Sequence, residues 1–430
     1  METFLNSLLA IFTQVGNLLF VPLIIIILGL VVRLGFKASL RSGLLTAVAL
    51  AGVGVILTLF LNTLQPVAEA IANKMGAGLK LTYIDVGWPA CFAAGVALPI
   101  GVSYVAIGVL VNLGLVLLRW VKTIQISVVE PIMGEGLIGY VAYAISGNYF
   151  VGLGVALSIK IITLILADWQ QPAVNDFFKF EGVSLIQTGV NEFGLLGWPI
   201  AWLLGKVPFL KNRHFTADWV QEKLGVFGEP MFLGVIFGIG LGLLAGFNYI
   251  QIITLSIYLA AAMNILPRMI GILMEGLIPV MRGVGDWLQL HAKGRKVYIG
   301  MDPAIGTGHP AILTTVMIMI PITVLIAVFL PGNKVLPLGD LVTLVFTFMF
   351  LVVPNKGDIL RSVITCIICV PILLWSTTLA APYIHHALTA AGVIDGSVPT
   401  LCMFEGGQFY WYPVNKLIEL ISGHVLPILQ

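Results

Sequence analysis

Ten long apolar blocks, five on each side of a polar stretch, restrict the folds that are open to this chain. A helix needs about 20 apolar residues to cross the hydrocarbon core of a bilayer. The blocks cover 8–32, 42–64, 86–118, 135–168 and 182–205, then 230–247, 249–274, 299–331, 338–353 and 359–381. Hydrophobic residues make up 59% of the chain and charged residues only 10%, which leaves no room for a separate soluble domain. The sequence therefore predicts an all-α polytopic membrane protein, formed by 1–430 as a single unit.

A short motif recurs half a chain length apart. The segment Tyr83–Ala90 is echoed by Tyr298–Ala304, and each motif opens a block that is too long for a single span. Motifs with acids and prolines that recur in an apolar chain are typical of transporters built from structural repeats, whose helices break near the membrane midplane. We therefore expect two repeats, 1–205 and 230–385, each with a re-entrant or broken helix at its motif.

The distribution of basic residues indicates that the two repeats have opposite orientations. The loop 33–41 after the first span carries three basic residues, whereas its counterpart 246–250 carries none. The next loop shows the reverse bias, because 282–298 is richer in Lys and Arg than 66–84. Positive charge marks the cytoplasmic side of a membrane. Five spans per repeat then give inverted repeats and place the linker 206–229 in the cytoplasm.

Three further segments complete the predicted architecture. The patterns of 66–82 and 279–293 predict amphipathic helices that lie along the membrane interface. The C-terminal segment 386–430 contains a run of aromatic residues, 409–412, followed by an amphipathic stretch. An eleventh helix there would place the C-terminus in the cytoplasm, so we expect ten or eleven transmembrane helices.

Acidic residues within the apolar blocks are candidates for a binding site, because charge inside a bilayer is costly. Asp85 and Trp88 lie in the first motif, and Asp302 lies in the second. Each aspartate is close to a proline, which breaks a helix and frees backbone groups. The two carboxylates either line a site for vicinal hydroxyl groups or cap the half-helices by accepting backbone N–H groups.

Four other polar residues join this candidate site. His309 lies between two helix breakers and would bind a substrate, orient Asp302 or simply pack. Glu181 and Gln187 begin the fifth block and would share one face of a helix, or mark the start of an interfacial helix. Glu405 is followed by glycines that allow close approach of the backbone.

Several classes of protein do not fit the sequence. The charge of +2 forms no basic stripe, which argues against nucleic acid as a partner. The sequence contains no HExxH motif and no GxSxG motif, so a membrane-embedded hydrolase has no support. The cysteines, Cys91, Cys366, Cys369 and Cys402, do not lie in polar loops, so we expect no phosphoryl-carrying residue on this chain. We also expect no catalytic residue, no metal and no cofactor.

The chain resembles the galactitol-type membrane component, enzyme IIC, of the bacterial phosphoenolpyruvate-dependent phosphotransferase system. The matching stretches are Asp85–Pro89, Glu181–Gly182, Phe227–Pro230, Leu266–Arg268, Gly300–Ala304 with Gly308–His309, and Pro331–Asn333 with Leu336–Leu341. The resemblance extends from about residue 20 to about residue 345 and so covers most of the chain.

The resemblance implies a homodimeric transporter of the bacterial inner membrane, with inverted repeats of five spans and an eleventh helix, related in fold to the ascorbate-type enzyme IIC. It implies that a polyol binds from outside and is presented to a cytoplasmic partner, enzyme IIB, which is served by enzyme IIA. A phosphocysteine of IIB would then phosphorylate the sugar. In this chain Ile186-Gln187 replaces the Pro-His of galactitol members. Since an amide and an imidazole select different hydroxyl patterns, this departure points to the polyol or sugar class and not to galactitol in particular.

Alternating access is the mechanism expected from these features, with the two broken-helix motifs carrying the substrate past the remaining spans. A second interpretation stays open. In it, Asp85 and Asp302 are ion sites of a proton- or sodium-coupled secondary transporter of a small polar solute.

Overall fold

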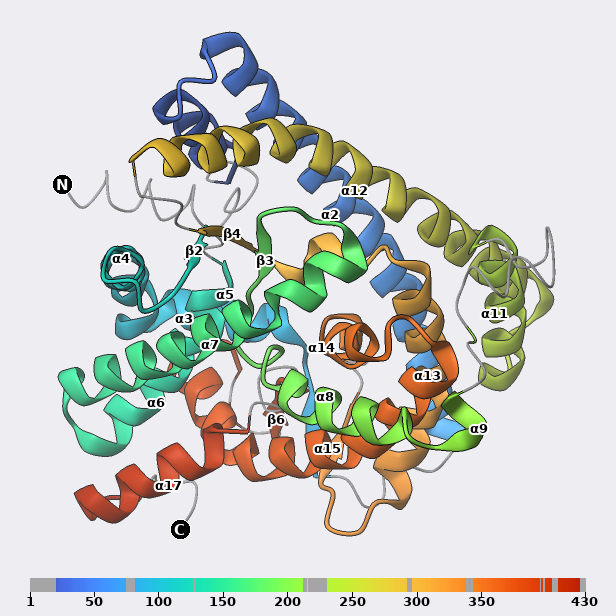
Figure 1. The fold of residues 1–430 in the computed structure, drawn as a ribbon. Helices are drawn as coiled ribbons and strands as arrows, with labels where there is room; N and C mark the ends of the chain where they lie inside the picture. Colours follow the sequence, from blue (N-terminus) through green and yellow to red (C-terminus); the bar gives the residue numbers. More distant parts are fainter. Residues whose placement is uncertain are drawn as a thin grey trace.

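The computed structural model describes most of the chain. The described residues are 21–74, 82–126, 129–211, 215, 230–291, 296–337, 340, 343–394, 396, 399–403 and 409–425. Within them the protein is largely helical (Figure 1). The four helices long and apolar enough to cross a membrane, among those described, are Phe36–Ile56 within α2, Tyr149–Phe178, Pro310–Phe329 and Ile359–Ala390. The coarse prediction of a helical membrane protein is confirmed.

The helices divide between the two halves of the chain. The first half contains a helix over Val21–Val31, then α2 (Phe36–Lys74), α3 (Trp88–Ala97), α4 (Pro99–Leu117), α5 (Val129–Met133), α6 (Glu135–Ser146), α7 (Tyr149–Phe178), α8 (Phe193–Leu204) and α9 (Pro208–Lys211). The second half contains α11 (Pro230–Ala245), α12 (Tyr249–His291), η3 (Pro303–Gly306), α13 (Pro310–Phe329), α14 (Leu344–Val352), η4 (Val353–Asn355), α15 (Ile359–Ala390) and α17 (Trp411–Ser422).

The overlong apolar blocks are broken. Block 86–118 forms α3 and α4, which are separated by the extended residue Leu98. Block 135–168 divides at Gly147, whose left-handed backbone ends α6. Block 182–205 is not one continuous helix, because it contains a strand and then α8, whose 12 residues rise only about 18 Å. The 12 residues of α17 are likewise too short to cross about 30 Å of hydrocarbon.

The predicted interfacial segments belong to two very long helices. Residues 66–74 are the end of α2, which has 39 residues, and residues 279–291 are the end of α12, which has 43. Neither segment forms a separate helix, since apolar and amphipathic stretches continue without a break. Figure 1 shows α2 and α12 side by side at one edge of the molecule, where α12 also packs against α11.

In the part of the chain that the structure describes, six short strands, which the sequence did not predict, form two parallel sheets. One sheet has β1 (Tyr83–Asp85) between β5 (Val335–Leu336) and β6 (Thr400–Leu401); the other has β4 (Tyr298–Met301) between β2 (Thr123–Gln125) and β3 (Val183–Leu185). Each central strand therefore comes from one half of the chain and pairs with two strands of the other half. The central strands β1 and β4 are the two echoed motifs.

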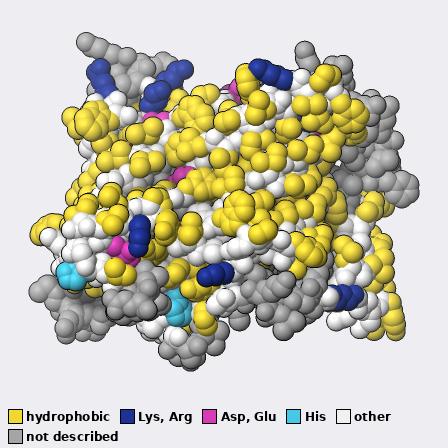
Figure 2. Space-filling view, turned by 90° about the horizontal axis from the view of Figure 1, so that it is seen from below, with side chains coloured by type: hydrophobic (Ala, Val, Ile, Leu, Met, Phe, Trp, Pro, Cys, Tyr) yellow, Lys and Arg dark blue, Asp and Glu magenta, His cyan; other side chains and the backbone are white. Residues whose placement is uncertain are grey.

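The surface fits a lipid environment. Figure 2 shows hydrophobic side chains over most of one face, with most Lys and Arg side chains toward its upper and lower borders. Large apolar side chains such as Val55, Leu110, Trp202, Leu243 and Phe329 are more than half exposed. An apolar belt of this kind is unusual for a soluble monomer, and it is the surface that a bilayer covers.

Small residues bring α11 close to α12. A Cβ atom added at Gly234 would lie 2.6 Å from the Cα of Ala260, and one at Gly238 would lie 2.3 Å from the Cα of Ser256. Gly242 and Gly246 are spaced as a GxxxG pair, a pattern that suits close packing of membrane helices. Gly242 does pack against Ile252 of α12, whereas Gly246 ends α11 with a positive φ of 76°. The contact that these glycines make is therefore within the chain.

We expect Gly238→Ala to destabilise the protein, because the added methyl group collides with backbone that cannot move away alone. Overpacking of this kind costs about 1–3 kcal/mol. Gly240→Ala is the matched control, since a Cβ atom there meets nothing within 4 Å. Thermal unfolding of the detergent-solubilised variants measures the effect. Equal midpoints for the two variants would show that this contact is not tight.

Candidate functional site

Asp85 connects the three strands of the first sheet at their carboxyl ends. Its side chain is 3% exposed. Oδ1 accepts hydrogen bonds from the amides of Gly87 (3.1 Å) and Met403 (3.0 Å), and Oδ2 accepts one from the amide of Asp340 (2.6 Å). The Oδ1 atom of Asp340 accepts in turn from the amide of Trp88 (2.8 Å). This geometry supports the capping role of Asp85, because the carboxylate satisfies backbone donors that would otherwise be buried without acceptors.

Asp302 and His309 cap the two helices that follow β4. Asp302 is half-buried, and its Oδ1 atom accepts from the amide of Ala304 at 2.8 Å, at the start of η3. His309 accepts from the amide of Ala311 through Nδ1 at 3.2 Å, at the start of α13. The imidazole ring lies 4.3 Å from the Phe177 ring, centroid to centroid. Each side chain still has atoms that these caps do not use.

Asp85→Ala is expected to unfold far more easily than the wild type. It leaves three buried amides without an acceptor, and each unsatisfied group costs about 1–3 kcal/mol. Asp85→Asn retains one acceptor oxygen and should fall between the two. Asp302→Ala, which removes one half-buried acceptor, is the control. The fraction of monodisperse protein after detergent extraction and its unfolding midpoint rank the stabilities of these variants. A wild-type midpoint for Asp85→Ala would contradict the role of Asp85 as an acceptor of backbone amides.

A buried cation lies in the middle of α7. Lys160 is 2% exposed and donates from Nζ to Oε1 of Gln125, at the end of β2. The carboxylate of Glu135, which is fully buried at the start of α6, interacts with the Lys160 ammonium and approaches the Thr188 hydroxyl. The Tyr104 ring centroid lies 5.9 Å from Nζ. Buried charge in a membrane protein is retained where it is paired and marks a functional region.

The loop after β3 extends this polar cluster. The amide of Gln187 donates to Oδ1 of Asn191 at 2.7 Å, and Nδ2 of Asn191 donates to Oε1 of Gln170 at 2.9 Å. Within the described residues, Oε1 of Gln187 is buried and accepts no hydrogen bond. The carboxylate of Glu192 approaches the Tyr410 hydroxyl. The loop is therefore held rigidly, with one side-chain acceptor of Gln187 still available.

The second sheet brings two of the predicted site residues together. Gln187 follows β3 and Asp302 follows β4, and these parallel strands pair at Leu185 and Met301. Gln125 ends β2 on the other side of β4. Since the carboxyl ends of parallel strands meet at one edge, Gln187, Asp302 and Gln125 lie near one another, together with Lys160. The contact between the rings of Phe193 and Phe409, at 4.9 Å, joins this region to the chain that follows β6.

The other predicted residues lie elsewhere. Asp85 and Trp88 belong to the first sheet. Glu181 is exposed in the turn between α7 and β3, and Glu405 lies outside the described residues. The sequence analysis missed Lys160, although a single lysine inside an apolar helix of 30 residues was a signal that could have found it. Glu192 gave no comparable signal, because it lies in a short polar stretch.

Glu135 and Lys160 should behave as a pair. Glu135→Gln or Lys160→Met alone leaves a buried charge without its partner, which costs about 3–5 kcal/mol. The double variant removes both charges and is expected to recover much of that loss. Unfolding midpoints of the four proteins form a double-mutant cycle, and additive effects would show that the two charges are independent.

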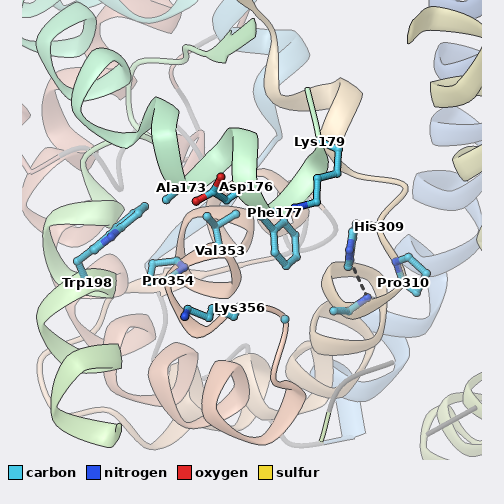
Figure 3. Close-up of a pocket in the computed structure, with 12 residues that line it drawn as sticks. Ala173, Asp176, Phe177, Lys179, Trp198, His309, Pro310, Val353, Pro354 and Lys356 are labelled. Carbon is cyan, nitrogen blue, oxygen red and sulfur yellow. Dashed lines mark hydrogen bonds between the residues drawn. The ribbon is translucent and has the colours of Figure 1, made fainter. Parts of the chain in front are cut away.

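A cavity of about 640 Å³ opens beyond the end of α7. It is lined by Asp176, Phe177 and Lys179 from the end of α7, by Trp198, by His309 and Pro310 at the start of α13, and by the η4 turn with Lys356 (Figure 3). A second cavity of about 310 Å³ shares Trp198, Pro354 and Lys356 with it. The lining of the first, larger cavity includes His309 but neither Asp302 nor Gln187.

Basic residues occupy unusual backbone positions at helix ends. Among the described residues other than glycine, positive φ angles occur at Arg33 (61°), Arg119 (68°), Lys179 (60°) and Lys356 (54°). This left-handed conformation costs a side-chain-bearing residue about 1–2 kcal/mol, and glycine normally fills it. At each of these four positions the chain carries a basic residue where glycine is the usual choice.

The comparisons with known proteins identify the family. Residues 10–398 match the family of PTS system sugar-specific permease components. The chain belongs to this family. It is 30% identical over 421 residues to the putative permease IIC component of Escherichia coli K12, covering 96% of this chain and 95% of that protein. It is also 30% identical over 418 residues to the galactitol-specific EIIC component of the same strain, covering 96% of this chain and 90% of that one.

Membership of this family agrees with the resemblance found in the sequence. The protein is an integral membrane component of a phosphotransferase system that transports sugars or polyols. The described residues contain no group of three His, Cys, Asp or Glu side chains that could hold a metal ion.

Proposed function

We propose that this protein transports a hexitol of the galactitol class across the bacterial inner membrane and presents it to a cytoplasmic IIB partner for phosphorylation. The observation that carries the proposal is the cluster of buried polar groups at the carboxyl edge of the second sheet. Gln125, Gln187 and Asp302 offer amide and carboxylate oxygens there, and Oε1 of Gln187 is buried without a donor in the described part of the chain. The galactitol-specific EIIC of E. coli is a relative of this chain.

A neutral polyol suits this kind of site. Its hydroxyl groups donate to carboxylates and amide oxygens and accept from an ammonium such as Lys160, so no net countercharge is needed. Each hydrogen bond contributes on the order of 1 kcal/mol net. Phosphorylation on the inner side makes the product anionic, which prevents its return through an apolar barrier. The driving force is then phosphoryl transfer from the partner.

We infer that the chain consists of inverted repeats, 1–205 and 230–385, joined by the linker 206–229. The exchange of strands between the halves supports this, because β1 with its neighbours and β4 with its neighbours have equivalent pairings. The helix ends support it too. The turn at Arg33 has the same backbone hydrogen-bond pattern as the turn at Gly246, with Leu34 bonded to Gly29 and Phe247 bonded to Gly242.

The same comparison supports the orientation of the repeats. Basic residues hold the left-handed positions at Arg33 and Lys179, whereas glycines hold the equivalent positions at Gly246 and Gly392. Since positive charge marks the cytoplasmic side, we infer that Arg33 and Lys179 both face the cytoplasm, and that residues 182–205, a short strand and a 12-residue helix, do not cross the membrane between Lys179 and the linker. The cavity beyond α7 then opens toward the cytoplasm, where the partner acts.

Alternating access follows from this arrangement. The two sheets and the helices packed on them form one body, and the long helices α2, α11 and α12 form a second body that stays fixed in the membrane. We propose that the first body carries the polyol across by moving against the second, and that two copies of the chain assemble into a homodimer through the second.

Uptake of radiolabelled galactitol by membrane vesicles tests the function. We expect uptake to require phosphoenolpyruvate and the soluble partner proteins, and to persist in the first minutes after a protonophore is added. Collapse with the protonophore alone, without any need for partners, would instead show ion coupling. Sorbitol and mannitol in the same assay identify the hexitol that is preferred.

Two variants test the site in the same vesicles. Asp302→Asn keeps the cap on η3 but removes the charge, and Gln187→Ala removes a free acceptor. Each is expected to lower uptake at least about tenfold, which is the effect of losing one hydrogen bond to a buried polar group. Gln251→Ala, at the exposed start of α12, is the control. Normal uptake by both variants would exclude this edge of the sheet as the site.

A further inference from the structure

The cavity beyond α7 has the size of a ligand-binding site. Of the site residues predicted from the sequence, its lining includes His309 alone. Its volume of about 640 Å³ lies within the range of roughly 300–1,000 Å³ that is typical of small-molecule sites. Figure 3 shows Asp176, Phe177, Val353, Pro354 and Lys356 around one space, with His309 on its far side. Three segments that are distant in sequence meet here: the end of α7, the start of α13 and the η4 turn.

Two lysines give the cavity its charge. Lys179 and Lys356 lie on different sides of Phe177 (Figure 3), and both are exposed. Within the described residues neither lysine forms an ion pair. Asp176 is the carboxylate in the lining, so two ammonium groups outnumber one carboxylate. The lining also includes the N-terminus of α13, a helix of 20 residues, whose dipole favours an anion.

Both lysines have a left-handed backbone conformation, which is unfavourable for a residue with a side chain. Lys179 ends α7 with a φ of 60°, and Lys356 ends η4 with a φ of 54°. At the position equivalent to Lys179 in the second half, Gly392 takes the same conformation with a φ of 69°. Glycine is thus compatible with such a turn in this protein, yet lysine occupies positions 179 and 356, and in the η4 turn the left-handed Gly357 follows Lys356 with a φ of 74°. Both lysines line the same cavity.

We propose that this cavity binds a phosphate monoester, with Lys179 and Lys356 as the residues that hold its anionic oxygens. Charge-assisted hydrogen bonds from ammonium groups are among the strongest that a phosphate accepts. The source of this phosphate group is inferred from the proposed function. It belongs either to the phosphorylated hexitol as it leaves or to the phosphocysteine of the partner as it arrives, and both carry the same dianionic head.

Binding to the full chain in lipid nanodiscs tests this proposal without any transport. Trp198 lines the cavity, so its fluorescence reports occupancy, and Trp198→Phe should abolish the signal. The probes are galactitol 1-phosphate, inorganic phosphate, neutral galactitol and a phosphoserine peptide that mimics the phosphocysteine. Tighter binding of the hexitol phosphate identifies the product as the ligand, and tighter binding of the peptide identifies the partner.

Lys179→Gly and Lys356→Gly remove one charge each and relax the backbone, so both proteins should fold at least as well as the wild type. We expect each to weaken binding of the better phosphorylated probe about tenfold or more, as the loss of a hydrogen bond to a charged group does. Lys179→Arg should restore binding. Arg119→Gly is the matched control, because it makes the same change at a left-handed basic residue outside the cavity.

The proposal is overturned if both lysine variants bind every probe like the wild type, or if Arg119→Gly loses as much affinity as they do. The phosphate-binding proposal and the proposed transport function can fail independently of each other. If uptake proves independent of phosphoenolpyruvate while the lysine variants still lose phosphate affinity, the anion site stands and the transport mechanism falls.

Discussion

The need to satisfy backbone hydrogen bonds away from water governs this fold. The echoed motifs leave the helical conformation within a membrane protein, where a free N–H or C=O group costs several kcal/mol. The protein resolves this by placing each motif strand between two strands of the other half. Asp85 and Asp340 then accept the amides that emerge at the carboxyl edge of one sheet. The irregular backbone of the motifs is therefore hydrogen-bonded within the protein, and the same irregularity brings polar side chains together in the interior.

The sequence predicted what depends on composition and length, and missed what depends on contacts between distant segments. The apolar blocks and their breaks follow from hydropathy, glycine and proline, so the helical class and the break within block 86–118 could be found. Strands of two to four residues are too short to show a period, and their partners lie far along the chain. For the same reason 182–205 was taken for a span, since a three-residue strand and a short apolar helix have the composition of one.

The candidate site shows the same division. Asp302 and Gln187 were predicted as site residues because they interrupt apolar sequence, and the pairing of β3 with β4 brings the segments that follow these strands together. Asp85 was predicted by the same signal; both aspartates accept backbone amides in the structure, and no sequence pattern shows which of them also binds a substrate. The pairing of Lys160 with Gln125 depends on how α7 packs beside β2, which is a tertiary contact that the sequence does not show. Single ionisable residues within apolar helices are a better guide to such interiors than motifs.

The exchange of strands between the halves has a consequence for biogenesis. The strand β1 emerges from the ribosome early, but its neighbour β6 is among the last segments to be synthesised. Until then the amides around Asp85 lack their final arrangement, so the nascent first half must wait in the translocon or lipid in an incomplete form. Loop-closure entropy makes such late, distant pairings slow. A ribosome that stalls before codon 400 would therefore release a chain that is inserted but not assembled, a natural substrate for membrane quality-control proteases.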